Sequence, residues 1–163
     1  MTAATVHASA VLVGARAVLI RGPSGAGKSR LALELIEAAR NGALLFAKLV
    51  GDDRVHLEAA GGRLLVRPAD ALQGLIELRG VGILRRAYEA CAVVGLVVDL
   101  AADDAERLPE RGQVAIAGIK IPRLAVAPGM AALPGVFTIV TSRGDIGVPE
   151  AGYYGREPGL AID

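Results

Sequence analysis

Short apolar runs broken by glycine or charged residues define the elements predicted in the first third of the chain. Residues 10–13 and 17–21 are rich in β-branched side chains and flank a glycine, which predicts a hairpin or two neighbouring strands. Residues 28–40 repeat apolar positions at helical spacing and carry charges on the other face, so they predict a helix that Asn41-Gly42 ends. Residues 43–50 are almost continuously apolar, as in a buried strand.

Strand-forming segments dominate the rest of the chain. They share an apolar, β-branched composition and lie at 55–57, 64–67, 75–78, 92–99, 114–116 and 120–126. The glycines between them predict that 55–57 pairs with 64–67, and 114–116 with 120–126, as hairpins. Residues 101–112 are charged and predict a mobile loop, and a short helix is expected around 136–142. Gly and Pro favour partial disorder in the tail from about residue 143. No repeat or linker divides the sequence, so we expect one α/β domain over 1–163, a mixed β-sheet flanked by helices.

The composition is that of a folded chain with little net charge. Its 163 residues are 53% hydrophobic, which excludes a disordered chain. A net charge of +1, 3% aromatic residues and no tryptophan argue against nucleic-acid binding, since there is neither a basic field nor a stacking platform. Apolar runs are shorter than the ~20 residues that cross a bilayer, and no signal-peptide pattern begins the chain. We therefore expect a cytoplasmic protein with no membrane or nucleic-acid partner.

A glycine-rich segment, Gly-Pro-Ser-Gly-Ala-Gly-Lys-Ser at 22–29, matches the P-loop pattern G-x-x-x-x-G-K-[ST] in full. Its glycines turn backbone N–H groups toward phosphate oxygens, and the following helix adds a partial positive charge at its N-terminus. We expect a nucleoside triphosphate here, with Lys28 on the β- and γ-phosphates and Ser29 on Mg²⁺. The predicted phosphate cradle comprises Gly22, Pro23, Ser24, Gly25, Ala26, Gly27, Lys28 and Ser29.

Two adjacent acids, Asp52 and Asp53, follow the strand predicted at 43–50. Open α/β sheets bind ligands at the carboxyl ends of their strands. One carboxylate there would accept a proton from an attacking hydroxyl, while its neighbour holds metal or orients the first. A solvated turn ahead of a hairpin explains the pair equally well, because Asp is common in turns. The residues alone leave both interpretations open.

Glu77 and Arg79 form a second candidate pair. Alternation along a strand places them on one face, where a carboxylate suits Mg²⁺ and a guanidinium suits a phosphate oxygen. Taken alone, the pair is better explained as an exposed ion pair that adds little stability. The Val-Val-Asp segment that ends at Asp99 is the closest match to a Walker B strand.

In this order, the segments resemble the catalytic domain of bacterial HPr kinase/phosphorylase. Residues 49–55 (Leu-Val-Gly-Asp-Asp-Arg-Val) and 76–83 (Ile-Glu-Leu-Arg-Gly-Val-Gly-Ile) carry the resemblance, with His7, 106–108 and 121–124 as further landmarks. The resemblance implies a fold akin to phosphoenolpyruvate carboxykinase, in the short single-domain form of α-proteobacteria. It implies phosphorylation of a serine on HPr, or on a nitrogen-related paralogue, by ATP and Mg²⁺. Reverse phosphorolysis and a hexamer are also properties of the family.

The same resemblance gives each candidate residue a role. Asp52 is implied as the acid/base and Asp53 as its companion, while Ser29 and Glu77 lie on the Mg²⁺ side. Pro134 is expected to interrupt the family's C-terminal helix. The implied catalytic set is Asp52, Asp53, Arg79, His7 and Arg107.

Two other hypotheses stay open on the sequence. A small-molecule kinase or a plain NTPase would use the same P-loop, because the motif alone does not name a reaction. A nucleotide-sensing module without catalysis is the third hypothesis.

Overall fold

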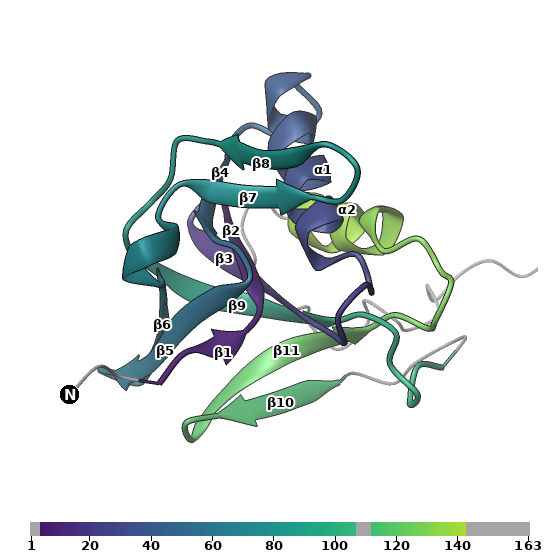
Figure 1. Ribbon diagram of the computed structural model, residues 1–163. Helices are drawn as coiled ribbons and strands as arrows, with labels where there is room; N and C mark the ends of the chain where they lie inside the picture. The colour runs from purple at the N-terminus through teal and green to yellow at the C-terminus, as the bar shows by residue number, and fades with distance from the viewer. Residues whose placement is uncertain (1–3, 107–111, 143–163) are drawn as a thin grey trace, which may run out of the picture.

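A computed structural model describes residues 4–106 and 112–142 of the chain (Figure 1). Within these ranges the backbone forms a large mixed sheet, a separate hairpin, and the helices α1 (Lys28–Arg40) and α2 (Leu133–Thr141). The separate hairpin pairs β7 (Leu75–Leu78) with β8 (Gly82–Arg85), after a 3-10 turn at Asp70–Leu72. The strands of the large sheet are β1 (Val6–His7), β2 (Ser9–Val13), β3 (Arg16–Arg21), β4 (Ala47–Gly51), β5 (Arg54–Ala60), β6 (Arg63–Pro68), β9 (Ala92–Asp99), β10 (Gln113–Ile116) and β11 (Ile119–Ala125).

Strand β9 is the centre of the sheet. Along one edge, β9 pairs with β3 in parallel. Along the other edge, the start of β9 pairs with β6 in antiparallel orientation, and its end pairs with β11 in parallel. Because β3, β9 and β11 run in one direction, their carboxyl ends, at Arg21, Asp99 and Ala125, lie at one edge of the sheet. The glycine-rich segment leaves β3 at this edge, where α/β sheets bind ligands.

The buried core has two parts, one on each face of the sheet. Val18 and Ile20 of β3 contribute to the part that α1 and α2 cover, and Ala17 and Leu19 to the part beneath the β5–β6 hairpin. The alternation follows from the two-residue repeat of a strand. Figure 1 shows both helices on the same side of the sheet, with the β7–β8 hairpin crossing beside α1.

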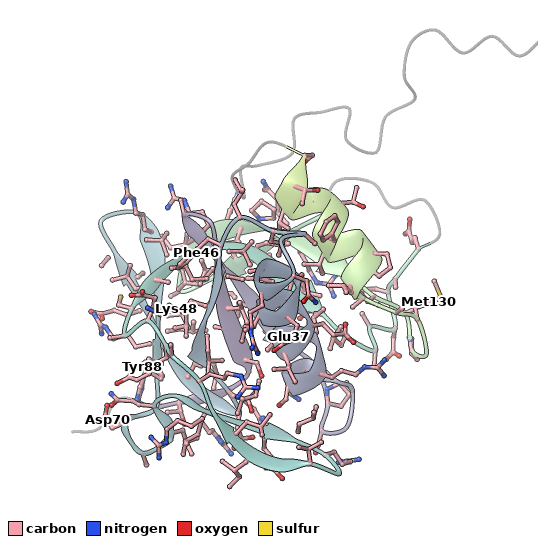
Figure 2. The ribbon with its side chains drawn as sticks, turned by 90° about the horizontal axis from the view of Figure 1, so that it is seen from above. Glu37, Phe46, Lys48, Asp70, Tyr88 and Met130 are labelled. Atoms are coloured by element: carbon pink, nitrogen blue, oxygen red, sulfur yellow. The ribbon has the colours of Figure 1, made fainter. Side chains whose placement is uncertain are left out.

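Helix α1 spans the residues that the sequence predicts. Leu31, Leu35 and Ile36 are buried against the sheet, whereas Glu37 is partly exposed (Figure 2). The helix ends at Asn41, and Gly42 adopts a φ of 78°, a left-handed conformation that glycine accepts without strain.

The strand predicted at 43–50 is shorter in the structure and begins at Ala47. The N–H groups of Ala43 and Leu44 donate instead to the carbonyl of Ala38, at 2.8 and 3.1 Å, and so extend the C-terminal turn of α1. The hairpins predicted on either side of residues 14, 61 and 118 are confirmed.

The prediction that Pro134 interrupts the C-terminal helix is wrong, because Pro134 lies in the first turn of α2. A first-turn N–H has no partner within a helix, so a proline there loses no hydrogen bond. The predicted loop at 101–112 is described only for residues 101–106 and 112, and the tail beyond residue 142 lies outside the described residues. Among the described helices, neither is long and apolar enough to cross a membrane.

Candidate active site

The P-loop connects β3 to α1, as the motif requires. Gly25 and Gly27 have φ values of 83° and 98°, left-handed conformations that other residues adopt only with strain. The turn is closed by the N–H of Ala26, which donates to the carbonyl of Pro23 at 3.1 Å. Gly27 is the N-cap of α1, so the free N–H groups of the first helical turn face the loop.

Lys28 folds back over the P-loop and is only 7% exposed. Its Nζ donates to the carbonyls of Gly22, at 2.8 Å, and Pro23, at 3.1 Å. These contacts hold one positive charge against the loop that would enclose phosphate groups.

Asp52 is buried beside the P-loop, with 3% of its surface exposed. It accepts hydrogen bonds from Ser9 Oγ at 2.6 Å and from Ser29 Oγ at 2.8 and 2.9 Å. The backbone N–H of Glu77 donates to its Oδ2 at 3.1 Å. Three chain segments thus converge on this one carboxylate. It is hydrogen-bonded to the hydroxyl of Ser29, which is predicted to bind Mg²⁺.

Asp53 has a different environment, although it is the next residue. Its φ of 67° is unusual for a residue other than glycine and directs the chain sharply from β4 into β5. Its Oδ1 lies 3.4 Å from Nε2 of His7, and the two side chains are 57% and 47% exposed. The carboxylate is therefore accessible from the cavity that both residues line.

Glu77 and Arg79 belong to the β7–β8 hairpin, beside the P-loop. Glu77 is exposed at the strand edge, and Arg79 lies just beyond the last residue of β7. The guanidinium nitrogens of Arg79 lie 3.7 and 3.9 Å from the position that a Cβ on Gly25 would take. Arg79 thus reaches over the P-loop, and a phosphate held there would meet its charge.

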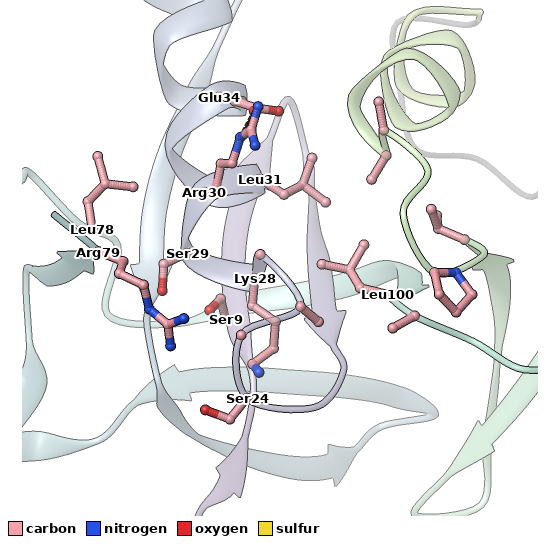
Figure 3. A pocket seen from close by; sticks show the side chains of 18 of the residues that line it. Ser9, Ser24, Lys28, Ser29, Arg30, Leu31, Glu34, Leu78, Arg79 and Leu100 are labelled. Atoms are coloured by element: carbon pink, nitrogen blue, oxygen red, sulfur yellow. Dashed lines mark hydrogen bonds and ion pairs between the residues drawn. The ribbon is translucent and has the colours of Figure 1, made fainter.

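A cavity of about 900 Å³ unites these groups. In Figure 3, Ser9, Ser29 and Arg79 lie to one side of Lys28, and Leu31 and Leu100 to the other. The predicted site residues that line it are His7, Ser24, Gly25, Ala26, Gly27, Lys28, Ser29, Asp52, Asp53, Glu77 and Arg79. Gly22 and Pro23 contribute through the carbonyls that hold Lys28, and Arg107 lies outside the described residues.

Two parts of the site were not predicted from the sequence. Ser9 is completely buried and donates to Asp52, and a serine within an apolar strand is the one sign of it in the sequence. The segment from Val126 to Ala132, between β11 and α2, forms a second wall of the cavity. Its Ala- and Pro-rich composition carries no motif.

The Walker B interpretation of Asp99 does not fit the structure. Its carboxylate accepts two hydrogen bonds from Arg21, at 2.7 and 2.8 Å, and one from Arg123 at 2.5 Å. Burial raises the pKa of Asp99, but the two guanidinium groups outweigh it and hold that pKa below the usual value. Arg123 also binds Asp104, at 2.7 and 3.0 Å, and lowers the pKa of that carboxyl. Asp52 occupies the position beside Ser29 instead.

The oxygen-bearing side chains beside the P-loop suit a hard cation. Ser29 Oγ, the carboxylate of Asp52 and the exposed carboxylate of Glu77 lie around the P-loop. Within the described residues, no group of three or more His, Cys, Asp or Glu side chains forms a cage for a metal ion. Mg²⁺ in nucleotide sites needs few protein ligands, because phosphates and water supply the others. The donor set therefore fits Mg²⁺ bound together with a nucleotide.

Comparisons with known proteins agree with the motif order. Residues 1–132 match the family model described as the HPr Serine kinase C-terminal domain. The HPr kinase/phosphorylase of Streptococcus thermophilus is 36% identical over 135 residues, and that of Streptococcus uberis 35%. These matches cover 75% of this chain and 41% of each relative, so the chain spans about two fifths of their length.

A solved structure extends the agreement to the fold. The Hpr(Ser) kinase/phosphatase from Coxiella burnetii superposes with a TM-score of 0.69 at 27% sequence identity. The match covers 84% of this chain and 93% of the other.

Proposed function

Since this chain belongs to the family of the HPr serine kinase C-terminal domain, we propose that it transfers the γ-phosphoryl group of ATP to a serine of the phosphocarrier HPr or of a nitrogen-related paralogue. The observation that carries the proposal is the convergence of a P-loop, two acids of opposite exposure and an arginine on one cavity. This arrangement supports the proposal, because a phosphoryl transfer needs groups that hold the donor and groups that receive the acceptor.

The nucleotide phosphates are held by the P-loop in this proposal. Backbone N–H groups at the start of α1 and the ammonium of Lys28 neutralise the phosphate oxygens, and Arg79 approaches from the hairpin. Ser29 and Asp52 would hold Mg²⁺, with Glu77 at the same side. When bound, the ion neutralises charge on the β- and γ-phosphates.

We propose Asp53, rather than Asp52, as the group that accepts the serine proton. Asp52 is only 3% exposed and accepts hydrogen bonds from Ser9, Ser29 and the Glu77 N–H, so an incoming hydroxyl has little access to it. Asp53 is 57% exposed at the cavity, where an incoming hydroxyl can reach it. His7, at 3.4 Å, orients the Asp53 carboxylate. The two acids thus exchange the roles that the sequence resemblance implies.

Further properties follow from the family and complete the proposal. Reverse phosphorolysis would use inorganic phosphate to attack the phosphoserine and would release pyrophosphate, with Asp53 returning the proton to the serine oxygen. Arg107 would neutralise the transferred phosphoryl group. We also propose that the protein forms a homo-oligomer, as the hexamers of the family do, and that it is located in the cytoplasm.

The test is incubation with ATP, Mg²⁺ and the purified host phosphocarrier, followed by intact mass of the carrier. One added phosphate on the carrier is expected. Asp53→Asn should lower the transfer rate by roughly 10²-fold or more while it retains ATP binding, since only the proton acceptor is lost. Asp52→Asn should instead weaken the Mg²⁺ dependence of nucleotide binding, because it changes the carboxylate beside Ser29.

Asp70→Asn is the matched control, because Asp70 is exposed and lies outside the cavity. If Asp53→Asn phosphorylates the carrier at the wild-type rate, the assignment of the proton acceptor is wrong. Phosphate that is transferred to a metabolite, or released to water with no carrier needed, would favour the small-molecule kinase or NTPase. Tight ATP binding with no turnover in the presence of carrier would favour the sensing module.

A further inference from the structure

The cavity has a polar and an apolar side, with Lys28 between them. In Figure 3, Ser9, Ser29 and Arg79 lie on one side of Lys28, called the polar side here, and Asp52 is hydrogen-bonded to both of these serines. The opposite side is formed by an apolar wall, defined here as Leu31, Leu100, Val126, Pro128 and Met130. This wall comes from α1, from the residue after β9 and from the segment between β11 and α2.

We propose that the apolar wall binds the base and ribose of the nucleotide, an inference that rests on the proposed nucleotide-dependent function. An acceptor hydroxyl must approach the terminal phosphate beside a group that takes its proton. Asp52 lies on the polar side, hydrogen-bonded to Ser9 and Ser29, and Asp53 follows it with His7 at 3.4 Å. The nucleoside therefore extends in the other direction, where apolar side chains can cover the faces of a base.

The size of the cavity supports a ligand larger than a triphosphate. It continues along α1 from Lys28 to Glu34, a distance of about 9 Å at the helical rise of ~1.5 Å per residue. Its volume of about 900 Å³ lies at the upper end of the ~300–1,000 Å³ typical of small-molecule sites. Phosphate groups held at the P-loop would leave the space beside α1 to the nucleoside.

The rim of the apolar wall is a rigid turn. In the sequence Ala127-Pro128-Gly129-Met130, Gly129 has a φ of 77°, and the N–H of Met130 donates to the carbonyl of Ala127 at 3.1 Å. Pro at the second position and a glycine of positive φ at the third are the pattern of a type II turn. The turn fixes the backbone from which Met130 projects over the cavity.

Met130 is the wall residue best suited to touch a base. Its side chain is 67% exposed, lines the cavity and lies at the periphery of the molecule (Figure 2). By contrast Leu31, Leu100 and Val126 are at most 8% exposed and form the floor. A flexible thioether packs favourably against an aromatic ring, so a bound base would cover Met130.

Methyl NMR of the full chain tests this inference directly. The chain contains two methionines, Met1 and Met130, so ¹³C-methyl labelling gives two signals, and Met130→Leu assigns them. With Mg²⁺ present, ATP should shift the Met130 signal through the ring current of the base. Inorganic tripolyphosphate, which has no base, should displace ATP without causing that shift.

Binding titrations of two variants supply the matched control. Met130→Ala should weaken ATP binding by roughly fivefold, through lost apolar contact, and leave tripolyphosphate binding within about twofold. Ile83→Ala removes an equally exposed apolar side chain from the β7–β8 hairpin and should change neither.

Two outcomes separate the inference from the proposed function. If ATP binds without shifting the Met130 methyl signal, and if Met130→Ala leaves the affinity for ATP unchanged, the nucleoside subsite is overturned. The P-loop function stands in that case. If neither ATP nor tripolyphosphate binds, the proposed function fails, and the inference fails with it.

Discussion

Asp52 and Asp53 are adjacent in sequence, yet their environments are opposite. One is buried at 3% exposure beneath three hydrogen-bond donors, and the other is exposed beside His7. The reversal depends on the φ of 67° at Asp53, which ends β4 and turns the second carboxylate outward. The two neighbouring acids therefore differ in their access to the cavity and in their hydrogen-bond partners.

Gly51 directly precedes this turn. A substitution at Gly51 tests how closely the surrounding atoms are packed. A Cβ on Gly51 would lie 2.8 Å from Cγ1 of Val55 and 3.1 Å from Cα of Pro68, so buried atoms would have to move. Gly51→Ala is expected to lower the free energy of unfolding by about 2 kcal/mol, measured by urea denaturation.

Gly135→Ala is the control for this change. Gly135 lies in α2, where the nearest atom to an added Cβ is 3.4 Å away, and its φ is not positive. The same substitution should there raise the free energy of unfolding by about 0.5–1 kcal/mol, as for glycine in a helix. Equal effects at both positions would contradict the packing argument.

At the scale of elements, the β7–β8 hairpin is the least supported part of the site. Its two strands pair only with each other among the described strands, and an isolated hairpin is at best marginally stable in water. Ile76 of β7 is completely buried in the helix-side core, Leu84 of β8 packs against the same core, and the Glu77 N–H donates to Asp52. The position of Arg79 over the P-loop therefore depends on the packing of this hairpin against the core, chiefly through Ile76, and on the hydrogen bond to Asp52.

Ile76→Ala tests this dependence. Loss of the buried side chain should cost about 2–4 kcal/mol and loosen the hairpin first. Hydrogen exchange of the amides in β7 and β8 should accelerate more than exchange in β3 and β9, and phosphoryl transfer should slow because Arg79 is less well positioned. Ile83→Ala, on the exposed face of the same hairpin, should leave both unchanged. A uniform loss of protection across the sheet would contradict an independent role of the hairpin.

For the whole molecule, the charge network around Asp99 joins the carboxyl ends of three parallel strands. Arg21 ends β3, Asp99 ends β9, Arg123 belongs to β11, and Asp104 follows β9. Arg21 immediately precedes the P-loop, and the N–H of Leu100 donates to its carbonyl at 2.8 Å. The network thus fixes the edge of the sheet from which the P-loop leaves.

The pH dependence of stability follows from the sign of the Asp99 shift. The pKa of Asp99 in the folded protein lies below the ordinary value of 3.8, so ionised Asp99 stabilises the folded state. This contribution is complete above about pH 5 and is lost as the pH falls through the folded pKa. Asp99→Asn should lower the free energy of unfolding by about 2 kcal/mol at pH 7 and reduce its fall between about pH 5 and pH 3.

Chemical denaturation at several pH values measures both effects. Asp70→Asn, at an exposed position outside the network, should retain the wild-type pH dependence. If Asp99→Asn and the wild type lose stability in parallel on acidification, Asp99 does not supply the acid-sensitive part.

The sequence alone determined the P-loop, α1 and the hairpins at residues 14, 61 and 118, because each depends on local spacing and on turn residues that lie within a few positions. It also determined the family, through the order of segments at 22–29, 49–55 and 76–83. Strand β8 escaped prediction because its residues are mostly exposed and carry no alternation, so its pairing with β7 alone defines it.

Only the tertiary structure decided which carboxylate is buried and which is exposed. Ser9 and Asp52 are 43 residues apart, and Arg21 and Asp99 are 78 apart, so no local pattern relates them. Their pairing follows from strand order, which places β2 between β3 and β4 and β9 beside β3. The same long-range packing brought the Val126–Ala132 segment to the P-loop and so formed the apolar side of the cavity. Burial and partner choice are properties of the assembled sheet, and for that reason the sequence named the acids but not their opposite environments.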